Sequence, residues 1–462
     1  MYWHLQMHKS GPRLAAITPP KQPLSTIRLL RRVVDNPIKA WPQAIYRQHL
    51  YRSSVLGHDI IYVMAPELIR TVLLDEADNF EKGEIVRRAL GPALGGAILT
   101  ADGSRWRWQR RAVSAMFRQE RVREFLPAMI AAAERTRDRW HSLPSGTEID
   151  VAQEMMRTTF DIILNTVVPG RGNIDTELMK HSVTHYLEPT SWIVALAMIG
   201  APSWAPYPGM YRARRGRKQL HCMLESLIGQ AKQSPADRND LLSLLLNATD
   251  PETGQSMTAM DVRDNLLTFI TAGHETTALA LTWTLYLLSL HPEVERRVKC
   301  EIAAATEGGP VRPTHIDALG YTNQVIQEAM RLYPPAALIV REARRDVTLG
   351  TEHVRAGTSV YVPVYAVHRH ETLWREPDRF DPNRFEPAAA QARDRYSYLP
   401  FGAGPRICIG QNFALMEAAA VLATLLSSFQ LRIRPGHNPE PRLRVTLRPR
   451  GGMPMRIAWV GR

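Results

Sequence analysis

Residues 401–410 read FGAGPRICIG, and in them three glycines, a proline and an arginine surround a single cysteine, Cys408. The next segment, NFALMEAAAVLATLL, has the length and apolar content of a buried helix, which places Cys408 just before a helix N-terminus. Backbone N–H groups and the helix dipole at that position stabilise a thiolate, which can act as a nucleophile or a metal ligand. The alternative is a buried structural cysteine beside a turn, and the surrounding residues decide between the two.

The composition is that of a large globular chain. Of its 462 residues, 45% are hydrophobic and 22% are charged. The three cysteines form no CxxC pair, which excludes a disulfide scaffold and a structural zinc site and fits a reducing cytoplasm. No signal peptide is expected, because the N-terminus mixes His, Lys and Arg among its apolar residues and carries several prolines. No transmembrane anchor is expected, because the most apolar run, residues 276–290, is shorter than the ~20 residues that span a bilayer. We therefore expect a cytoplasmic protein.

Apolar periodicity predicts a mainly helical protein. A period near 3.6 dominates residues 120–330, while alternating β-branched stretches at 55–66, 347–367 and 443–450 predict small flanking sheets. No low-complexity linker divides the chain, so we expect one domain over residues 41–462 after an N-terminal extension, residues 1–40. The net charge of +13 favours an acidic partner, and no nucleic-acid-binding motif accompanies it.

The cysteine loop resembles that of the cytochrome P450 family. The family's Phe-x-x-Gly-x-Arg-x-Cys-x-Gly pattern is matched by Phe401, Gly404, Arg406, Cys408 and Gly410. The resemblance implies a single-domain cytochrome P450 fold, with haem b between a long central helix and the cysteine-loop helix. Cys408 would be the axial thiolate ligand of the iron. Phe401 would contact the haem, and Gly402, Gly404 and Gly410 would let the backbone approach it.

A long helix is predicted from a capping box, Thr258 and Asp261, to about Leu290. Its middle, AGHETT (272–277), matches the family's segment above the haem, in which Gly273 would permit close ligand approach. The resemblance implies that Glu275 and Thr276 deliver protons, the hydroxyl holding water or oxygen and the carboxylate relaying protons from solvent. The alternative is a threonine bonded to its own helix beside a surface glutamate.

Three further motifs fit the family. Glu328 and Arg331 lie three apart on one helical face and match its Glu-x-x-Arg motif, with Arg384 as the expected third member of a structural triad. The family often has Glu where Asn383 stands, which we interpret as a tolerated surface change. The resemblance implies that donors from three segments hold the haem propionates: Trp106, Arg110, Arg341 and Arg406. His368 is a weaker candidate for the same role.

The resemblance implies a monooxygenase that activates O₂ with two external electrons and hydroxylates or otherwise oxidises a hydrophobic molecule. A haem-thiolate isomerase or peroxygenase, or a non-catalytic haem sensor, is the alternative. No dinucleotide fingerprint occurs in the sequence, so the electrons are expected to come from a separate acidic ferredoxin or flavodoxin with its reductase. The enzyme itself is expected to be a monomer. In the family, partners dock on the thiolate side, here an arginine-rich face: Arg105, Arg107, Arg110, Arg111, Arg118, Arg121 and Arg123.

Family analogy places the substrate pocket under residues 85–102 and 180–215 and above Ala336–Val340. These stretches are apolar with few charges, which predicts a hydrophobic substrate such as a terpenoid, fatty acid, polyketide or aromatic compound. Residues 191–211 could instead touch a membrane. We favour core or lid packing, because no basic amphipathic face accompanies them in the sequence.

Overall fold

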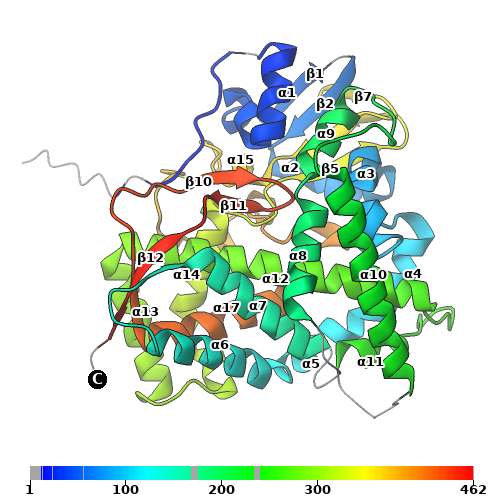
Figure 1. Ribbon diagram of the computed structural model, residues 1–462. Coiled ribbons are helices and arrows are strands. Elements are labelled where there is room, and N and C mark those ends of the chain that lie inside the picture. The colour runs from blue at the N-terminus through cyan, green and yellow to red at the C-terminus, as the bar shows by residue number, and fades with distance from the viewer. Residues whose placement is uncertain are drawn as a thin grey trace, which may run out of the picture.

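The central helix α12 (Ala259–Leu290) organises the structure, a computed structural model that describes residues 12, 14–22, 24–55, 57–167, 175–233 and 240–460. The predicted capping box is present, since Thr258 Oγ1 accepts from the Asp261 N–H and the Asp261 carboxylate accepts from the Thr258 N–H. Figure 1 shows α12 crossing the molecule among other helices. Those around it are α6 (Leu126–His141), α7 (Val151–Val167), α13 (Pro292–Thr306), α14 (Gly320–Leu332) and α17 (Gln411–Leu426).

A second group of helices lies over the N-terminal half of α12 (Figure 1). It comprises α3 (Gly83–Leu94), α4 (Gly103–Ser114), α5 (Gln119–Arg123), α8 (Thr176–Leu187), α9 (Thr190–Met198), α10 (Met210–Gln233) and α11 (Leu241–Leu246). Helix α1 (Thr26–Asp35) packs against α9, and three short helices complete the set: α2 (Pro66–Arg70), α15 (Val364–Val367) and α16 (Pro387–Ala392).

Small sheets flank the helices, as the alternating stretches predict. The largest has the order β1 (Leu50–Val55), β2 (His58–Val63), β8 (Ser359–Val362), β5 (Ile339–Ala343), β3 (Phe80–Glu81), with only the β2–β8 pair parallel. A second contains β4 (Glu148–Asp150), β12 (Pro454–Trp459) and β9 (Phe429–Ile433). Two hairpins pair β6 (Val347–Leu349) with β7 (Glu352–Val354) and β10 (Glu440–Leu443) with β11 (Leu447–Arg450). The architecture is therefore the mainly α fold with small flanking sheets that the sequence predicts.

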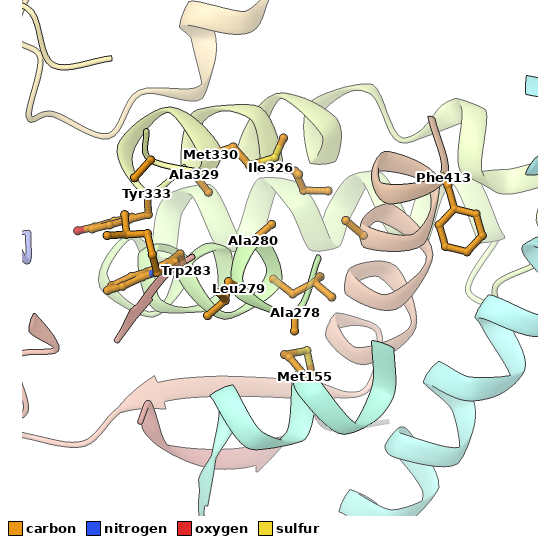
Figure 2. Close-up of a cluster of buried hydrophobic side chains, with 14 of the residues drawn as sticks. Met155, Ala278, Leu279, Ala280, Trp283, Ile326, Ala329, Met330, Tyr333 and Phe413 are labelled. Atoms are coloured by element: carbon orange, nitrogen blue, oxygen red, sulfur yellow. The ribbon is translucent and has the colours of Figure 1, made fainter. Parts of the chain in front are cut away.

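Aromatic packing joins α12 to α14 in the core. The Trp283 and Tyr333 rings stack with centroids 4.0 Å apart, beside the small residues of α12 that allow close helix approach (Figure 2). Trp283 Nε1 donates to the Leu447 carbonyl (3.1 Å), which ties the β10–β11 hairpin to the same cluster. The burial of such aromatic side chains is worth several kcal/mol in total. This cluster fixes α12, and therefore the residues at its middle, relative to the hairpin.

The segment before residue 41 contributes to this core. The Ala15 N–H donates to the Tyr286 hydroxyl (3.1 Å), and the Tyr333 hydroxyl donates to the Ala15 carbonyl (2.8 Å). Asn36 is fully buried and binds backbone groups of β10. The described part of the expected extension is thus fastened to the domain, while the boundary at residue 40 stays a prediction.

Candidate active site

A cavity of about 630 Å³ lies between α12 and the cysteine loop. Cys408 is exposed, and the surface that it exposes lies in this cavity. The expected roof and floor both contribute, through residues such as Ile85, Val194 and Val340. Aliphatic side chains predominate along these walls, so the cavity suits a hydrophobic ligand.

The sequence does not identify two other walls of the cavity. One comes from the N-terminal segment, where Leu29, Val33 and Pro37 line the space. The other is the turn of the β10–β11 hairpin, residues 443–446. The strong amphipathic pattern of α1 was a usable signal for the first wall, because Leu29 and Val33 are four residues apart on one helical face.

The cysteine loop is held by backbone hydrogen bonds. The Cys408 N–H donates to the Phe401 carbonyl (2.9 Å), and Gly404–Arg406 form a short 3-10 turn with Pro405 as its second residue. Gly404 has φ +71°, and a Cβ there would overlap the Leu73 carbonyl. Gly404 therefore serves close packing against a neighbouring backbone, which corrects the expectation that it lets the loop approach the haem.

The Cys408 thiol is not activated by its helix as strongly as the sequence suggests. Burial raises its pKa, and the Gly410 backbone N–H and the Arg110 guanidinium act in the opposite direction without cancelling that effect. A coordinated metal ion deprotonates a thiol outright. Gly410 precedes α17, and the expected haem contacts Phe401 and Gly402 also line the cavity.

Four cations gather at one wall of the cavity: Lys82, Arg110, Arg341 and Arg406. Arg406 binds Asp102 (2.6 Å) and lies over the Trp106 ring, 4.4 Å from its centroid. Burial, with Arg406 and Arg341 nearby, holds the pKa of Lys82 well below its usual value. Burial and the Arg406 charge lower the pKa of Arg341 to about 10. Crowded cations of this kind favour the binding of an anionic group, and the two propionates of haem would be such groups.

Lys82 is the member that sequence reasoning missed. Its Nζ donates to the Ile98 and Leu99 carbonyls, and the residue is 8% exposed. A lysine between a glutamate and a glycine resembles an exposed turn residue, so the local sequence gave no signal. The pairing of strand β3 with β5, which carries Arg341, brings it to the cavity.

At the middle of α12, Thr276 lines the cavity and its hydroxyl donates to the Ala272 carbonyl (2.7 Å). Many threonines form this bond, so it does not separate the two interpretations of Thr276. Glu275 does separate them, because it is 4% exposed and accepts hydrogen bonds from Thr446 and Arg448. The alternative of a surface glutamate is wrong. A Cβ at Gly273 would come within 3.1 Å of Ile163, so the space that a side chain at this position would need lies beside α7.

The expected triad is assembled, although its members bond unequally. Arg331 donates to both Glu328 oxygens (2.7 and 2.8 Å), and neither side chain is exposed to solvent. Arg331 also donates to the carbonyls of His368, Pro377 and Arg379. Arg384 lies 3.6 Å from Glu328, an ion pair beyond hydrogen-bond distance. The triad therefore orders the long 370–410 segment chiefly through Arg331.

His368, the weaker propionate candidate, has other partners. Its Nδ1 faces the Arg331 carbonyl (3.1 Å), and its Nε2 accepts from the Leu399 N–H (2.7 Å). A carbonyl can only accept and an N–H can only donate, so Nδ1 carries the proton. With both nitrogens engaged, His368 is a structural residue. Asn383 accepts from Arg297 (3.2 Å) at the surface, which is compatible with a tolerated change.

The arginine-rich face is less basic than its sequence suggests. Carboxylates neutralise five of its members in the pairs Arg105–Asp261, Arg107–Asp78, Arg111–Asp250, Arg121–Glu124 and Arg123–Asp317. Arg110 lines the cavity instead. Arg118 is exposed and has no partner among the described residues. Except for Glu124, the acids come from other segments of the chain, so the sequence of α4 and α5 alone overstates the free positive charge.

Residues 191–211 are divided between core and surface. Ser191 and Ala195 are buried in α9, whereas Trp204 and Tyr211 are 75% and 77% exposed. Lid packing therefore describes α9 and not the loop after it. Arginines at the start of α10 adjoin that loop, which removes the argument that no basic face accompanies it. Within the described ranges, no helix is both long enough and apolar enough to cross a membrane.

A cavity-facing cysteine, a wall of cations and a polar pair on a long apolar helix define a haem-thiolate enzyme. The cytochrome P450 family model matches residues 29–454, and the chain belongs to the cytochrome P450 family. Its cofactor is haem b with a cysteine thiolate ligand, and it is a monooxygenase that oxidises a hydrophobic small molecule with O₂.

Two bacterial relatives are similar over most of their length. The chain is 33% identical to cyclooctat-9-en-7-ol 5-monooxygenase of Streptomyces melanosporofaciens, covering 93% of this chain and 95% of that protein. It is 32% identical to pentalenene oxygenase of Streptomyces avermitilis, covering 81% and 82%. A crystal structure of the cytochrome P450DA haem domain has 24% identity and a TM-score of 0.81, covering 97% of this chain and 99% of that one. This likeness shows the fold.

Proposed function

We propose that this enzyme hydroxylates a cyclic terpenoid held in the aliphatic cavity beside Cys408. The observation that carries the proposal is the joint exposure of Cys408 and Thr276 to one cavity with mainly aliphatic walls. The names of the two Streptomyces relatives refer to terpenoids, which supports this class over fatty acids, polyketides and aromatic compounds.

Haem bound to the Cys408 thiolate would supply the chemistry that activates O₂, and this activation consumes two electrons from outside the protein. The protein's own residues hold and orient that group. Trp106, Arg110, Arg341 and Arg406, together with Lys82, would bind the propionates, as their crowded positive charge supports. Phe401, Gly402 and Gly410 would lie against the ring face on the sulfur side.

The proton path would begin at Glu275 and end at Thr276. Thr276 directs its hydroxyl proton to Ala272, so its oxygen remains able to accept a hydrogen bond from water in the cavity. Glu275 is fastened to Arg448, which is 34% exposed and therefore reaches toward solvent. A relay through this pair requires Glu275 to break its hydrogen bond with Thr446 or with Arg448.

Electrons would come from a separate acidic ferredoxin or flavodoxin, each served by its reductase. Exposed Arg118 and the half-exposed Arg107 support docking on the sulfur side, because α5 packs against α17, the helix that follows Cys408. We further propose that the enzyme works as a cytoplasmic monomer.

The reduced, CO-bound absorption spectrum tests the haem assignment, and a titration of the haem spin state tests the substrate. Thiolate ligation predicts a red-shifted Soret band that Cys408→Ser removes; a band that survives in the variant would overturn the ligand assignment. Cyclic terpenoids should shift the spin state at lower concentration than palmitate or a polyketide lactone of similar size. Tighter binding of the linear or lactone ligands would overturn the terpenoid class.

A further inference from the structure

The β10–β11 hairpin carries four arginines, three of which have carboxylate partners. Arg442 and Arg450 pair with Asp35, at 3.8 and 3.2 Å, and Arg448 pairs with Glu275. The fourth, Arg444, has no carboxylate within ion-pair distance among the described residues. It lies in the turn that lines the cavity, as a half-buried cation on which Glu188 and Asp35 act only from beyond ion-pair distance.

The hydrogen bonds of Arg444 are also incomplete. Its Nη1 donates to the Ser191 hydroxyl of α9 (2.8 Å), and no other side-chain bond of Arg444 occurs among the described residues. Nη2 and Nε therefore keep donors available, and guanidinium donors match a planar carboxylate in bidentate geometry. An uncompensated charge at an apolar wall is costly unless a ligand pairs with it.

We propose that Arg444 binds a carboxylate carried by the substrate, at the end of the cavity bounded by α1 and α9. The proposal rests on the proposed function and narrows it from terpenoids to terpenoid acids. A methyl group of a terpene hydrocarbon becomes a carboxylate by oxidation, so an earlier oxidation of such a carbon is the class of reaction that would supply this substrate. The remaining apolar body of the ligand would then extend along the aliphatic walls toward Cys408.

Electrostatics at the turn agree with an anionic ligand of low charge. Burial and the nearby charges of Arg442 and Arg448 lower the pKa of Arg444, and the opposing effects of Glu188 and Asp35 do not cancel this, so a bound anion would relieve the remaining repulsion. A diphosphate would need more cations, and the neighbouring Arg442 and Arg448 already serve Asp35 and Glu275. A neutral alcohol could accept a hydrogen bond but would leave the charge uncompensated.

The same turn connects this site to the centre of α12. Thr446, two residues after Arg444, donates to Glu275, and the Arg444 N–H donates to the Thr446 carbonyl (3.0 Å). The proposed ligand site is therefore joined to Glu275 through the backbone of this turn. We expect Arg444 to anchor the carboxylate ligand, while Ser191 of α9 holds the guanidinium in place from its buried side.

The test compares dehydroabietic acid with its methyl ester, which share one ring system and differ in charge. Binding to the holoenzyme is measured by equilibrium dialysis, which does not depend on the haem spectrum, and by the spin-state shift. The wild-type protein should bind the acid at least about 10-fold more tightly than the ester, as charge-assisted hydrogen bonds allow. Arg444→Gln should weaken acid binding about 10- to 100-fold and leave ester binding within about 3-fold.

Arg442→Gln is the matched control, because it removes the same charge from the same hairpin but its partner is Asp35. Equal binding of acid and ester to the wild type, or equal losses in the two variants, would overturn the proposal. Haem content and melting temperature must be unchanged in Arg444→Gln, and Arg444→Lys should retain part of the preference. Tight binding of the ester, with no preference for the acid, would support the terpenoid class and reject the carboxylate site. An Arg444-dependent preference for palmitate would retain carboxylate binding and reject the terpenoid class.

Discussion

Glu275 and Arg448 form an ion pair across 173 residues of chain, between the middle of α12 and strand β11. The carboxylate is 5% exposed, and Thr446 donates a second hydrogen bond to the same oxygen. The pair fastens the hairpin that lines the cavity to the helix that crosses it. It also gives the acidic residue of the AGHETT segment a fixed position.

Removal of Arg448 should destabilise the protein more than its surface position suggests. Arg448→Gln leaves a buried carboxylate without its cation, which should lower the free energy of unfolding by about 2–4 kcal/mol. Arg450→Gln, in the same strand but paired with Asp35 at an exposed site, should cost less than about 1 kcal/mol. Urea denaturation measures both. The double variant with Glu275→Gln should recover part of the loss, and equal stability of the two single variants would contradict this account.

Thr276→Ala should uncouple electron use from product formation. The variant loses the hydroxyl oxygen that faces the cavity but keeps the helix, so haem content and ligand affinity should stay within about 2-fold. A larger share of the electrons should appear as hydrogen peroxide, with product yield per reductant falling about 3-fold or more, in keeping with the loss of one proton-delivery group. Thr271→Ala is the control, since Thr271 also lines the cavity and bonds to its own helix. Unchanged coupling in Thr276→Ala would remove Thr276 from the relay.

Within the triad, Arg331 and Arg384 should have unequal effects. Arg331→Lys forfeits the bidentate bond to Glu328 and three bonds to carbonyls in a fully buried site, which should cost about 3–5 kcal/mol and reduce haem retention. Arg384→Lys, 3.6 Å from Glu328, should cost about 1 kcal/mol. Thermal unfolding of the two proteins and their haem content per chain would show the difference. A similar loss in both would mean that the 3.6 Å contact is stronger than its distance indicates.

The sequence predicts the features that short-range spacing encodes. The capping box of α12, the Glu328–Arg331 pair and the cavity-facing cysteine each depend on residues within one or two helical turns or within one loop. The Gly404 explanation failed because the steric demand comes from Leu73, far away in the chain. A glycine in a loop indicates that space is needed without telling which neighbour needs it.

Charge partners were the other feature that the sequence could not supply. The arginines of α4 look unpaired along the chain, yet Arg105 and Arg111 bind Asp261 and Asp250 after folding. Lys82 looks exposed and is buried. Such pairings depend on tertiary contacts between distant segments, and no periodicity in one segment specifies them. For the same reason, the sequence alone does not show that Arg444 lacks an ion-pair partner among the described residues.

Acid should destabilise the protein through His368. Burial lowers the folded-state pKa of His368 to about 3, so the folded protein keeps it neutral while the unfolded chain binds a proton below about pH 6.5. Its contribution to stability is therefore present at neutral pH and is lost as pH falls from about 6.5 toward 3, by up to about 1.4 kcal/mol per pH unit. His368→Gln should flatten the fall of unfolding free energy in this window. A slope in this window that is the same with and without His368 would contradict this account.

Reversal of charge at Arg107 and Arg118 should slow electron transfer from an acidic partner. Both side chains are exposed on the sulfur side. Within the described part of the chain, the single ion pair of Arg107 is with Asp78, which is 87% exposed and contributes little. Arg111 is a poor test position, because its bidentate bond to the buried Asp250 makes its loss a folding defect.

The Arg107→Glu/Arg118→Glu protein should accept its first electron about 10-fold more slowly at low salt, as stopped-flow absorption would measure, and the difference should shrink as salt screens the charges. Arg28→Glu/Arg31→Glu on α1 carries the same charge change on exposed side chains far from the cysteine loop and should leave the rate nearly unchanged. Equal slowing in both double variants would show that net charge, and not a docking face, governs the encounter. A rate that no salt concentration alters would place the partner's docking site away from α4 and α5.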